Sequence, residues 1–306
     1  MVEVLLIIQI MLRHHPVLAK ETYENLPHPL ILSFDGTFWH GGHVEYFFTH
    51  LEQDNPDECK NLKIVACDVD EKVMAKWKEF VSARKNQISF YHSSYANIKE
   101  ISQKEWLFDF MLLDLWVNLE HFKDGSRGFS IKSDAPLDMR FDTSKWEPAS
   151  HLINKWSKEE LEEMLVKYGD FTPRNAEYVV KWIIEKRKKS PIETTNNLTT
   201  TLHELWFWDK RIAVIFQAIR IQTNHELDQL ETFLKDFWEC LNIGGRCAIM
   251  TYHSIEDRMT KIAFKELEES GNFHLVNKKV IQPNYKEVEA NKAARSAKLR
   301  IIERVN

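Results

Sequence analysis

The sequence predicts an α/β protein built on a doubly wound, Rossmann-like sheet that is interrupted by a mostly helical insertion. Up to about residue 119, short apolar runs typical of buried parallel strands alternate with amphipathic segments. Strand-like runs become scarce between residues 120 and 216 and return at residue 246. Because 306 residues exceed the usual size of a single core, we expect a discontinuous sheet domain, 1–119 and 217–306, and an inserted domain, 120–216.

The first expected strands are apolar runs that end at turn residues. They are Leu30–Phe34, Leu62–Cys67 and Ile88–Tyr91. Between the last two, Glu71–Arg84 has apolar residues at helical spacing and is predicted to be a helix. This alternation of strand and helix is typical of a parallel sheet covered by helices.

The insertion carries two clear helical segments, Lys158–Tyr168 and Arg174–Lys188. Ser157 is a good N-cap for the first, with acidic residues in the first turn, and Gly169 stands where that helix should end. After the insertion, the strand-like segments are Arg246–Tyr252, Phe273–Ile281 and Lys298–Glu303. We expect these later strands to complete the interrupted sheet.

Residues 34–43, Phe-Asp-Gly-Thr-Phe-Trp-His-Gly-Gly-His, join the first strand to an expected helix through a glycine-containing turn. Asp68 follows at the end of the second strand. A tight turn lets a ligand approach the backbone, and a carboxylate on the next strand can accept ribose hydroxyls. The order therefore indicates a site for an adenosine cofactor, although a glycine turn alone also ends many strands that bind nothing.

Further motifs follow in a definite order along the chain. They are Leu112–Leu115, Arg127–Ser130, Pro136–Arg140, Phe216–Ile221 with Asn224 and Glu226, Gly244–Arg246, Tyr252–Arg258 and Ala294–Arg300. In order and spacing, from about His15 to Arg304, the set resembles the ribosomal RNA small-subunit methyltransferase H family.

The resemblance implies a class I methyltransferase sheet and an enzyme that uses S-adenosylmethionine. Its expected reaction is methylation of the N4 amine of a decoding-centre cytidine in 16S rRNA, with the assembled small ribosomal subunit as partner. A methyltransferase of this fold that acts on DNA or protein is the competing class, since fold does not determine substrate. It is disfavoured because the inserted domain and the final motif also match the rRNA family, and no Asp-Pro-Pro-Tyr-like signature occurs.

The resemblance also assigns the cofactor contacts. They fall on Gly41, Gly42, His43, Asp68, Tyr95, Asp114 and His121. The helix amino terminus at the first three residues can hold the methionine carboxylate through backbone N–H groups. Structural alternatives are a surface position for His43, an exposed strand end for Asp68 and a core aromatic role for Tyr95. His121 stands where the family has glutamine, which puts that contact in doubt.

Catalysis requires a proton acceptor, because the lone pair of a cytosine amine is delocalised into the ring and the amine is a poor nucleophile. The site should hold the amine in line with the methyl group and accept its proton as the bond forms. Asp114, Asn118 and His253 are the expected catalytic residues, with Asn118 replacing a family serine. The target base must also leave any stack to enter the pocket.

Contacts to RNA are expected from polar members of the matched motifs and from a basic carboxyl-terminal segment. The candidates are Arg140, Asn224, Glu256, Arg258, Arg295 and Lys298, with a second basic run at Lys181–Lys189. Any of the motif residues could instead belong to a buried structural ion pair, and a charge run is often a solvated face. The net charge of −5 fits an enzyme that relies on an assembled particle for recognition.

Two tryptophans depart from the family pattern, which has glycine at both positions. Trp39 lies in the cofactor turn, and Trp116 follows closely after Asp114. Backbone with φ > 0 suits glycine and not tryptophan. The chain of 306 residues also has only 9 glycines but 10 tryptophans, where about 7% glycine is usual.

Our hypothesis is that the gene uses a code in which UGA means glycine, and that UGA has been read as tryptophan. Trp206 and Trp208 are further candidates for this misreading, whereas Trp146 or Trp156 can be authentic. The alternative is a genuine but degenerate paralogue that binds RNA or the ribosome without catalysis. The sequence by itself leaves both readings open.

Composition and cysteine usage predict a cytoplasmic location. The chain is 43% hydrophobic and 28% charged, and its four cysteines show no metal-ligand spacing, so we expect reduced thiols and no metal. Cys67 and Cys247 lie in apolar strands and are expected in the core. Val4–Leu12 is too short to span a bilayer, so we expect no membrane segment and interpret this run as a packing segment or a start codon placed too early. The oligomeric state stays open, with a homodimer as one option.

Overall fold

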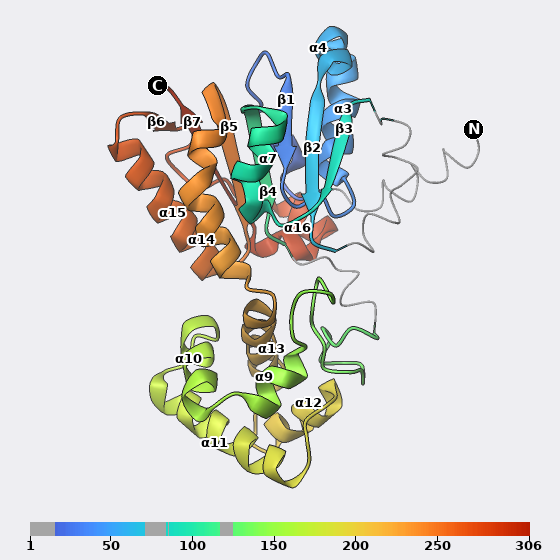
Figure 1. Ribbon diagram of the computed structural model, residues 1–306, viewed down its shortest axis with the longest axis vertical. Coiled ribbons are helices and arrows are strands. Elements are labelled where there is room, and N and C mark those ends of the chain that lie inside the picture. Colours follow the sequence, from blue (N-terminus) through green and yellow to red (C-terminus); the bar gives the residue numbers. More distant parts are fainter. Residues whose placement is uncertain (1–15, 71–83, 85, 117–124) are drawn as a thin grey trace, which may run out of the picture. The chain divides into compact units, whose positions relative to one another are not determined.

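A seven-stranded sheet forms the centre of one of the two units of the protein (Figure 1). The computed structural model describes residues 16–70, 84, 86–116 and 125–306. One unit comprises Met1–Trp116 and Gln229–Asn306, and the other comprises Val117–Asp228. The apolar run Val4–Leu12 and the predicted helix Glu71–Arg84, apart from Arg84, lie outside the described residues.

The strand order in the sheet is β3-β2-β1-β4-β5-β7-β6. The strands are β1 (Leu32–Asp35), β2 (Lys63–Asp68), β3 (Ile88–His92), β4 (Phe108–Asp114), β5 (Leu241–Thr251), β6 (Phe273–Leu275) and β7 (Lys298–Arg304). The first five pair in parallel, whereas β7 runs antiparallel to both β5 and β6. The predicted doubly wound α/β sheet of class I methyltransferase type is confirmed.

Both faces of the sheet are covered, because successive residues of a strand point to opposite sides. On one side, Phe47 and Phe48 of α3 (Gly42–Asp54) join a buried cluster with strand residues such as Ile64 and Phe110. On the other side, Phe233 of α14 (Glu226–Asp236) stacks on Phe237, which in turn contacts Phe264. The rigid sheet thus lies between two apolar layers, which hold its strand ends in place.

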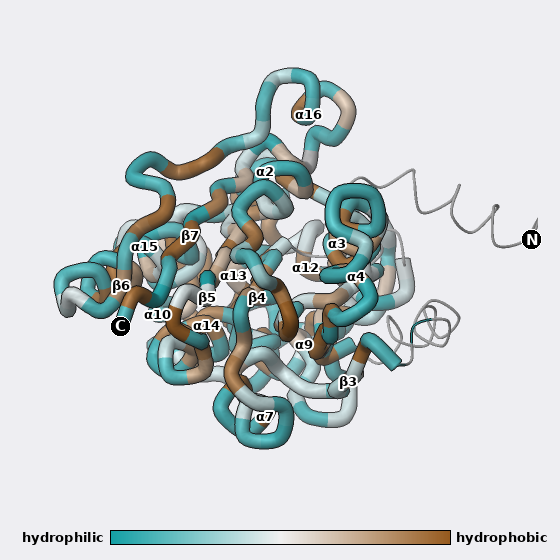
Figure 2. The backbone as a smooth tube through the Cα atoms, turned by 90° about the horizontal axis from the view of Figure 1, so that it is seen from above, coloured by the Kyte–Doolittle hydropathy of each residue, from teal (hydrophilic) through white to brown (hydrophobic). Residues whose placement is uncertain are grey.

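The sheet unit contains several further helices. They are α2 (Ala19–Tyr23), α4 (Pro56–Asn61), α7 (Ile98–Glu105), α15 (Ser254–Glu269) and α16 (Tyr285–Ala290), with short 3-10 turns at Tyr95–Asn97, Phe237–Cys240 and Lys292–Ser296. Figure 2 shows α4 as hydrophilic over most of its length. Cys67 and Cys247 are fully buried in the strands, as expected.

The second unit is helical in its regular elements. They are α9 (Ala149–Lys155), α10 (Lys158–Tyr168), α11 (Pro173–Lys189), α12 (Thr195–His203) and α13 (Asp209–Thr223). The predicted α10 has the expected bounds: Ser157 and Glu160 form a capping box, and the helix ends at Gly169. The boundary expected between residues 216 and 217 falls inside α13. That helix packs on α9 and α10, so the chain leaves this unit only after Asp228.

The predicted strand Phe273–Ile281 is shorter than expected. Regular pairing ends at Leu275, and Ile281 returns for one isolated bridge to Leu299. The side chain of Asn277 accounts for the difference: it accepts from the Ile301 amide at 2.8 Å and donates to the Lys279 carbonyl at 2.8 Å. The Asn277 side chain thus makes hydrogen bonds to the main chain in place of strand–strand hydrogen bonds, and asparagine often bonds to nearby backbone groups in this way. None of the described helices is long and apolar enough to cross a membrane.

Candidate cofactor and catalytic site

Three acidic residues stand at the carboxyl edge of the parallel strands. Asp35 ends β1, Asp68 ends β2 and Asp114 ends β4. Because β1 lies between β2 and β4, the direction of strand addition reverses at β1, and such a point is where open α/β sheets bind ligands. The acids therefore line the edge at which the sequence predicts a cofactor.

The turn after β1 is held against both neighbouring strands. Gly36 donates its amide to the Leu112 carbonyl at 2.9 Å, and Phe38 donates to the Cys67 carbonyl at 3.1 Å. A Cβ atom on Gly36 would lie 2.3 Å from the Leu113 side chain. Gly41, the N-cap of α3, has φ 64°, and a Cβ there would lie 2.6 Å from the Phe38 ring. Both positions thus require glycine, and the turn brings the helix amino terminus to the acidic edge.

Asp68 is buried and oriented by main-chain donors. One carboxylate oxygen accepts from the Trp39 amide at 2.9 Å, and the other accepts from the Asp70 amide at 2.8 Å. Burial raises the pKa of Asp68 to about 6, although the amides of Asp70 and Trp39 oppose the rise. Asp68 is therefore not an exposed residue at the end of a strand, because its side chain is buried.

Asp35 is a buried acid that the sequence analysis did not single out. Burial raises its pKa to about 7, the Thr37 amide opposes the rise, and the nearby charges of Asp114 and Asp68 add to it. Thr37 donates its amide to Asp35 at 3.1 Å, and its hydroxyl accepts from the Asp114 amide at 2.7 Å. In the sequence, Asp35 follows an apolar run and precedes Gly36, and this pattern could have identified it as a candidate site residue.

Asp114 lies in a cluster with His43 and Tyr252. His43 Nδ1 is 4.0 Å from Asp114 Oδ2, while His43 Nε2 lies 3.0 Å from the Val17 carbonyl. Burial raises the pKa of Asp114, and His43, the Tyr252 hydroxyl and the Trp116 amide oppose that rise. Burial lowers the pKa of His43, so the ring favours its neutral form. The surface alternative for His43 is excluded because the side chain is buried.

Tyr252 is a second site residue that sequence reasoning missed as an individual. It follows β5, interacts through its hydroxyl with Asp114, and also directs that hydroxyl to the Met250 sulfur at 3.1 Å. Burial and the adjacent carboxylate raise the pKa of Tyr252 well above its ordinary value, which keeps the phenol protonated. Only the fold brings this residue beside a strand end more than a hundred positions earlier in the chain.

Of the other predicted cofactor and catalytic residues, Tyr95 lies among the described residues, whereas Asn118 and His121 do not. Tyr95 is half-buried next to Ser94, and its ring contacts Phe233 edge-on with centroids 5.8 Å apart. This position at the end of β3 is compatible both with the core alternative and with a cofactor contact. Asn118 and His121 lie outside the described residues.

His253 and Glu256 form the amino-terminal cap of α15. The Glu256 carboxylate accepts from the amides of Tyr252 at 2.9 Å and His253 at 3.3 Å, and His253 Nδ1 accepts from the Glu256 amide at 3.4 Å. His253 Nε2 lies 2.9 Å from Glu256 Oε1 without hydrogen-bond geometry. Glu256 is buried and organises this turn, so its observed contacts are internal.

In the helical unit, Arg140 and Asn224 make internal contacts. Arg140 forms a two-pronged ion pair with Asp138 at 2.7 and 2.8 Å and donates to two carbonyl oxygens. The buried Asn224 side chain accepts from the Phe141 amide at 2.7 Å and donates to the Met139 carbonyl at 2.8 Å. The Asn224 bonds tie the loop at 138–141 to the end of α13, whereas the Arg140 bonds hold the loop itself together. Both residues therefore have the structural role that was the alternative to RNA contact.

The basic candidates of the sheet unit differ in their exposure. Arg258 and Arg295 are exposed, whereas Lys298 is half-buried and pairs with Asp257 at 2.9 Å. In the basic run of the helical unit, Lys186 pairs with Glu204, and Arg187 donates to the carbonyls of two residues at 2.6 and 2.7 Å. Part of each basic cluster is therefore structural.

Trp39 and Trp116 occupy different backbone environments. Trp39 has φ 50°, in the left-handed region where the sequence analysis placed glycine. Trp116 is absent from the positive-φ positions of the described chain, and its indole contacts the Tyr252 ring with centroids 4.6 Å apart. The backbone conformation therefore favours glycine at Trp39. At Trp116, glycine is favoured only by the space that an indole would occupy beside Asp114.

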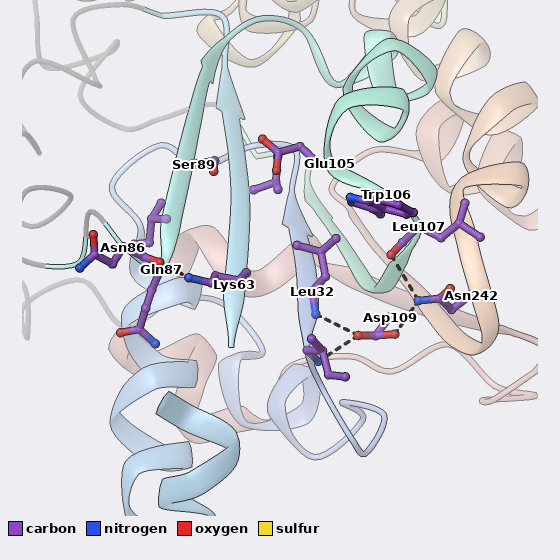
Figure 3. A pocket seen from close by; sticks show the side chains of 13 residues that line it. Leu32, Lys63, Asn86, Gln87, Ser89, Glu105, Trp106, Leu107, Asp109 and Asn242 are labelled. Atoms are coloured by element: carbon purple, nitrogen blue, oxygen red, sulfur yellow. Dashed lines mark hydrogen bonds between the residues drawn. The ribbon is translucent and has the colours of Figure 1, made fainter. Parts of the chain in front are cut away.

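A pocket of about 520 Å³ lies at the opposite, amino edge of the sheet (Figure 3). Its wall includes Leu32, Lys63, Ile88 and Asp109 from the starts of four strands, together with Trp106. Asp109 accepts there from the amides of Ile31 and Leu32, at 2.9 Å each. This cavity is separate from the acidic edge. Among the described residues, no cluster of three or more His, Cys, Asp or Glu side chains could hold a metal ion.

The acid-tipped parallel strands, the glycine turn and the antiparallel β7 define a Rossmann-like methyltransferase. The chain belongs to the MraW methylase family, whose model matches residues 11–305. The family expectation from the sequence motifs is confirmed, and the chain is an enzyme of the methyltransferase class.

Relatives match over almost their whole length. "Ribosomal RNA small subunit methyltransferase H" of Elusimicrobium minutum is 35% identical over 95% of this chain and 98% of its own. The protein of the same name in Coprothermobacter proteolyticus is 34% identical, over 96% of each chain. A solved rRNA methylase from Streptococcus thermophilus aligns with 94% of this chain and 95% of its own, at 12% identity and a TM-score of 0.39.

The buried Asp35 predicts a pH-dependent stability. A folded pKa near 7, above the ordinary 3.8, means that the stabilising contribution is present below pH 4 and is lost as the pH rises through 7. The Asp35→Asn variant should flatten the fall in unfolding free energy between pH 4 and 7, by up to about 1.4 kcal/mol per pH unit. Urea denaturation at several pH values measures this slope. The exposed Asp57→Asn is the control, and an unchanged slope in Asp35→Asn would refute the assignment.

Removal of the Asn224 side chain should destabilise the helical unit. Asn224→Ala leaves the Phe141 amide and the Met139 carbonyl without their partner, and a buried group left in this way costs about 1–3 kcal/mol. Asn196→Ala, at an exposed position of α12, should change little. Thermal denaturation compares the two. Full stability combined with weaker RNA binding in Asn224→Ala would instead make Asn224 an RNA contact.

Proposed function

We propose that this protein methylates the N4 amine of a cytidine in 16S rRNA of the small ribosomal subunit, with S-adenosylmethionine as the methyl donor. The observation that carries the proposal is the convergence of Asp68, Asp114 and the amino terminus of α3 at the strand edge where the sheet order reverses. The relatives' names identify them as small-subunit rRNA methyltransferases. The site chemistry is consistent with that activity.

The described residues fit the cofactor at both of its ends. The Asp68 oxygens accept the amides of Trp39 and Asp70, one on each, and a carboxylate has further acceptor capacity with which it can bind the ribose hydroxyls. Gly41 is the N-cap of the 13-residue helix α3, and Gly42 is its first residue. The first-turn N–H groups of a helix and its dipole favour an anion such as the methionine carboxylate. Tyr95, at the end of β3, is the aromatic candidate for the adenine.

The proton released by the amine goes to Asp114 in this proposal. S-adenosylmethionine, when bound, supplies a methyl group on a positively charged sulfur. Asp114 stands at the same edge, and burial raises its pKa, which makes it a better base than an exposed carboxylate. Tyr252 and the Trp116 amide restrain the rise and orient the carboxylate. His253 and Asn118, the latter outside the described residues, are the other predicted contacts to the base.

RNA recognition is assigned to exposed basic residues and to the assembled particle. Arg258 and Arg295 are exposed, and Lys298 lies beside Asp257 on the same unit. A chain with net charge −5 gains little from free-RNA attraction, so we infer that the substrate is the assembled subunit, and that the enzyme works in the cytoplasm where subunits form. The non-catalytic alternative has no support beyond the two site tryptophans.

Loss of the Asp114 carboxylate should abolish most of the methyl transfer. With undermethylated small subunits and isotopically labelled methyl donor, Asp114→Asn is expected to lower kcat by about 10²–10⁴-fold, because the proton acceptor is removed. Tyr252→Phe should move the pH profile of kcat to higher pH, since the hydroxyl that holds down the pKa of Asp114 is lost. Cofactor affinity measured by calorimetry separates binding from chemistry. Full activity of Asp114→Asn would exclude this acceptor.

Cofactor binding should depend on the two site tryptophans. The double variant Trp39→Gly, Trp116→Gly is expected to bind S-adenosylmethionine in a calorimetric titration more tightly than the chain as written, since an indole occupies space at the acidic edge. Trp182→Gly, at a helix residue in the other unit, is the matched control. Equal binding by all forms would show that the site tolerates both indoles, and binding by none would favour the non-catalytic alternative.

A further inference from the structure

Three tryptophans of the described chain have left-handed backbone conformations. Their φ angles are 50° at Trp39, 85° at Trp106 and 61° at Trp206. Positive φ is uncommon outside glycine, and Asn, Asp and His account for much of the rest. Bulky aromatic residues are true outliers there, because the Cβ atom meets the following carbonyl group. Such a conformation needs a compensating gain from the side chain.

Trp106 is the most restricted of the three. It ends α7 with φ 85° and ψ −173°, a combination that is essentially confined to glycine. Its amide donates to the Ser102 carbonyl at 2.8 Å, and its carbonyl accepts from the Ser102 hydroxyl at 3.0 Å, so the main chain holds this conformation. The indole is 82% exposed on the wall of the amino-edge pocket (Figure 3). Packing of the side chain therefore offsets little of the backbone cost.

Trp206 shows the same combination in the helical unit. It lies two residues after Glu204, the C-cap of α12, donates its amide to the His203 carbonyl at 2.9 Å, and has φ 61°, a left-handed conformation that glycine commonly supplies where a helix ends. Its indole is 91% exposed. A tryptophan is normally well buried, so an exposed indole on a left-handed residue gains nothing that explains its presence.

Other tryptophans of the same chain behave as expected for genuine ones. Trp182 lies inside α11 and donates its indole N–H to the Thr201 carbonyl at 3.1 Å. Trp238 donates its indole N–H to the Lys235 carbonyl at 2.8 Å. Neither has positive φ. Of these five tryptophans, the three at positions 39, 106 and 206 have positive φ, and the two with bonded indoles do not.

We propose that the working protein carries glycine at positions 39, 106 and 206, and that the tryptophans written there are glycine codons decoded as tryptophan. The proposal joins a backbone requirement at three separate turns to a composition of 9 glycines and 10 tryptophans. Trp106 was not among the positions that the sequence singled out, and its backbone alone identifies it. The Trp39 amide donates to Asp68, so an effect of glycine at position 39 on cofactor binding rests on the proposed function. The rest of the proposal does not.

The first test examines the gene and its natural product. We expect UGA at codons 39, 106 and 206, UGG at codon 182, and glycine at the three positions in peptide mass spectra of the protein isolated from its own cells. UGG at the three codons, or tryptophan in those peptides, would overturn the proposal. This outcome is independent of whether the protein methylates rRNA.

The second test measures the backbone requirement itself. Trp106→Gly and Trp206→Gly should each raise the midpoint of thermal unfolding by about 2–4 °C relative to the chain as written, because the left-handed conformation no longer strains a side chain. The same change at Trp182, inside a helix, should lower it. If both turn variants unfold at the same or a lower temperature than the chain as written, the backbone does not demand glycine. Failure of methyl transfer by a chain that also carries Trp39→Gly and Trp116→Gly, with raised midpoints, would refute the proposed function and leave this inference standing.

Discussion

The main-chain bonds that hold the turn after β1 are the constraint on which the site depends. Gly36 bonds to β4 and Phe38 bonds to β2, so the turn spans the point where the sheet order reverses. In this turn a side chain at Gly36 would clash with its neighbours, and Gly41 has φ 64°. As a result, α3 begins beside the acids, and a helix amino terminus faces an edge that is otherwise strongly negative.

The accumulation of negative charge at this edge follows from the same geometry. Parallel strands end at one side, so Asp35, Asp68 and Asp114 are forced close together in a buried place, and their pKa values rise. Backbone amides and the His43 ring offset part of the cost. Raised pKa values of this kind concentrate at functional sites, because a carboxylate must hold a proton tightly enough to accept one near neutral pH.

Much of the fold could be predicted because it depends on local patterns. Apolar runs identified the strands, and the Ser157 cap with Gly169 defined α10 to the residue. Errors arose where a tertiary contact replaced a local preference. The strand expected through Ile281 stops early because the Asn277 side chain bonds to β7, and α13 extends the helical unit because it packs on α9 and α10. Neither contact is visible in a window of sequence.

By itself, the sequence determined the class of fold, the family and the order of the acidic strand ends, because hydrophobic period and motif spacing are encoded along the chain. The tertiary structure decided which polar groups meet. It added Asp35 and Tyr252 to the site, and it engaged Arg140 and Asn224 in internal bonds. It also showed which tryptophans have a left-handed backbone conformation. These outcomes depend on backbone dihedrals and on contacts between residues far apart in the chain, which no local pattern records.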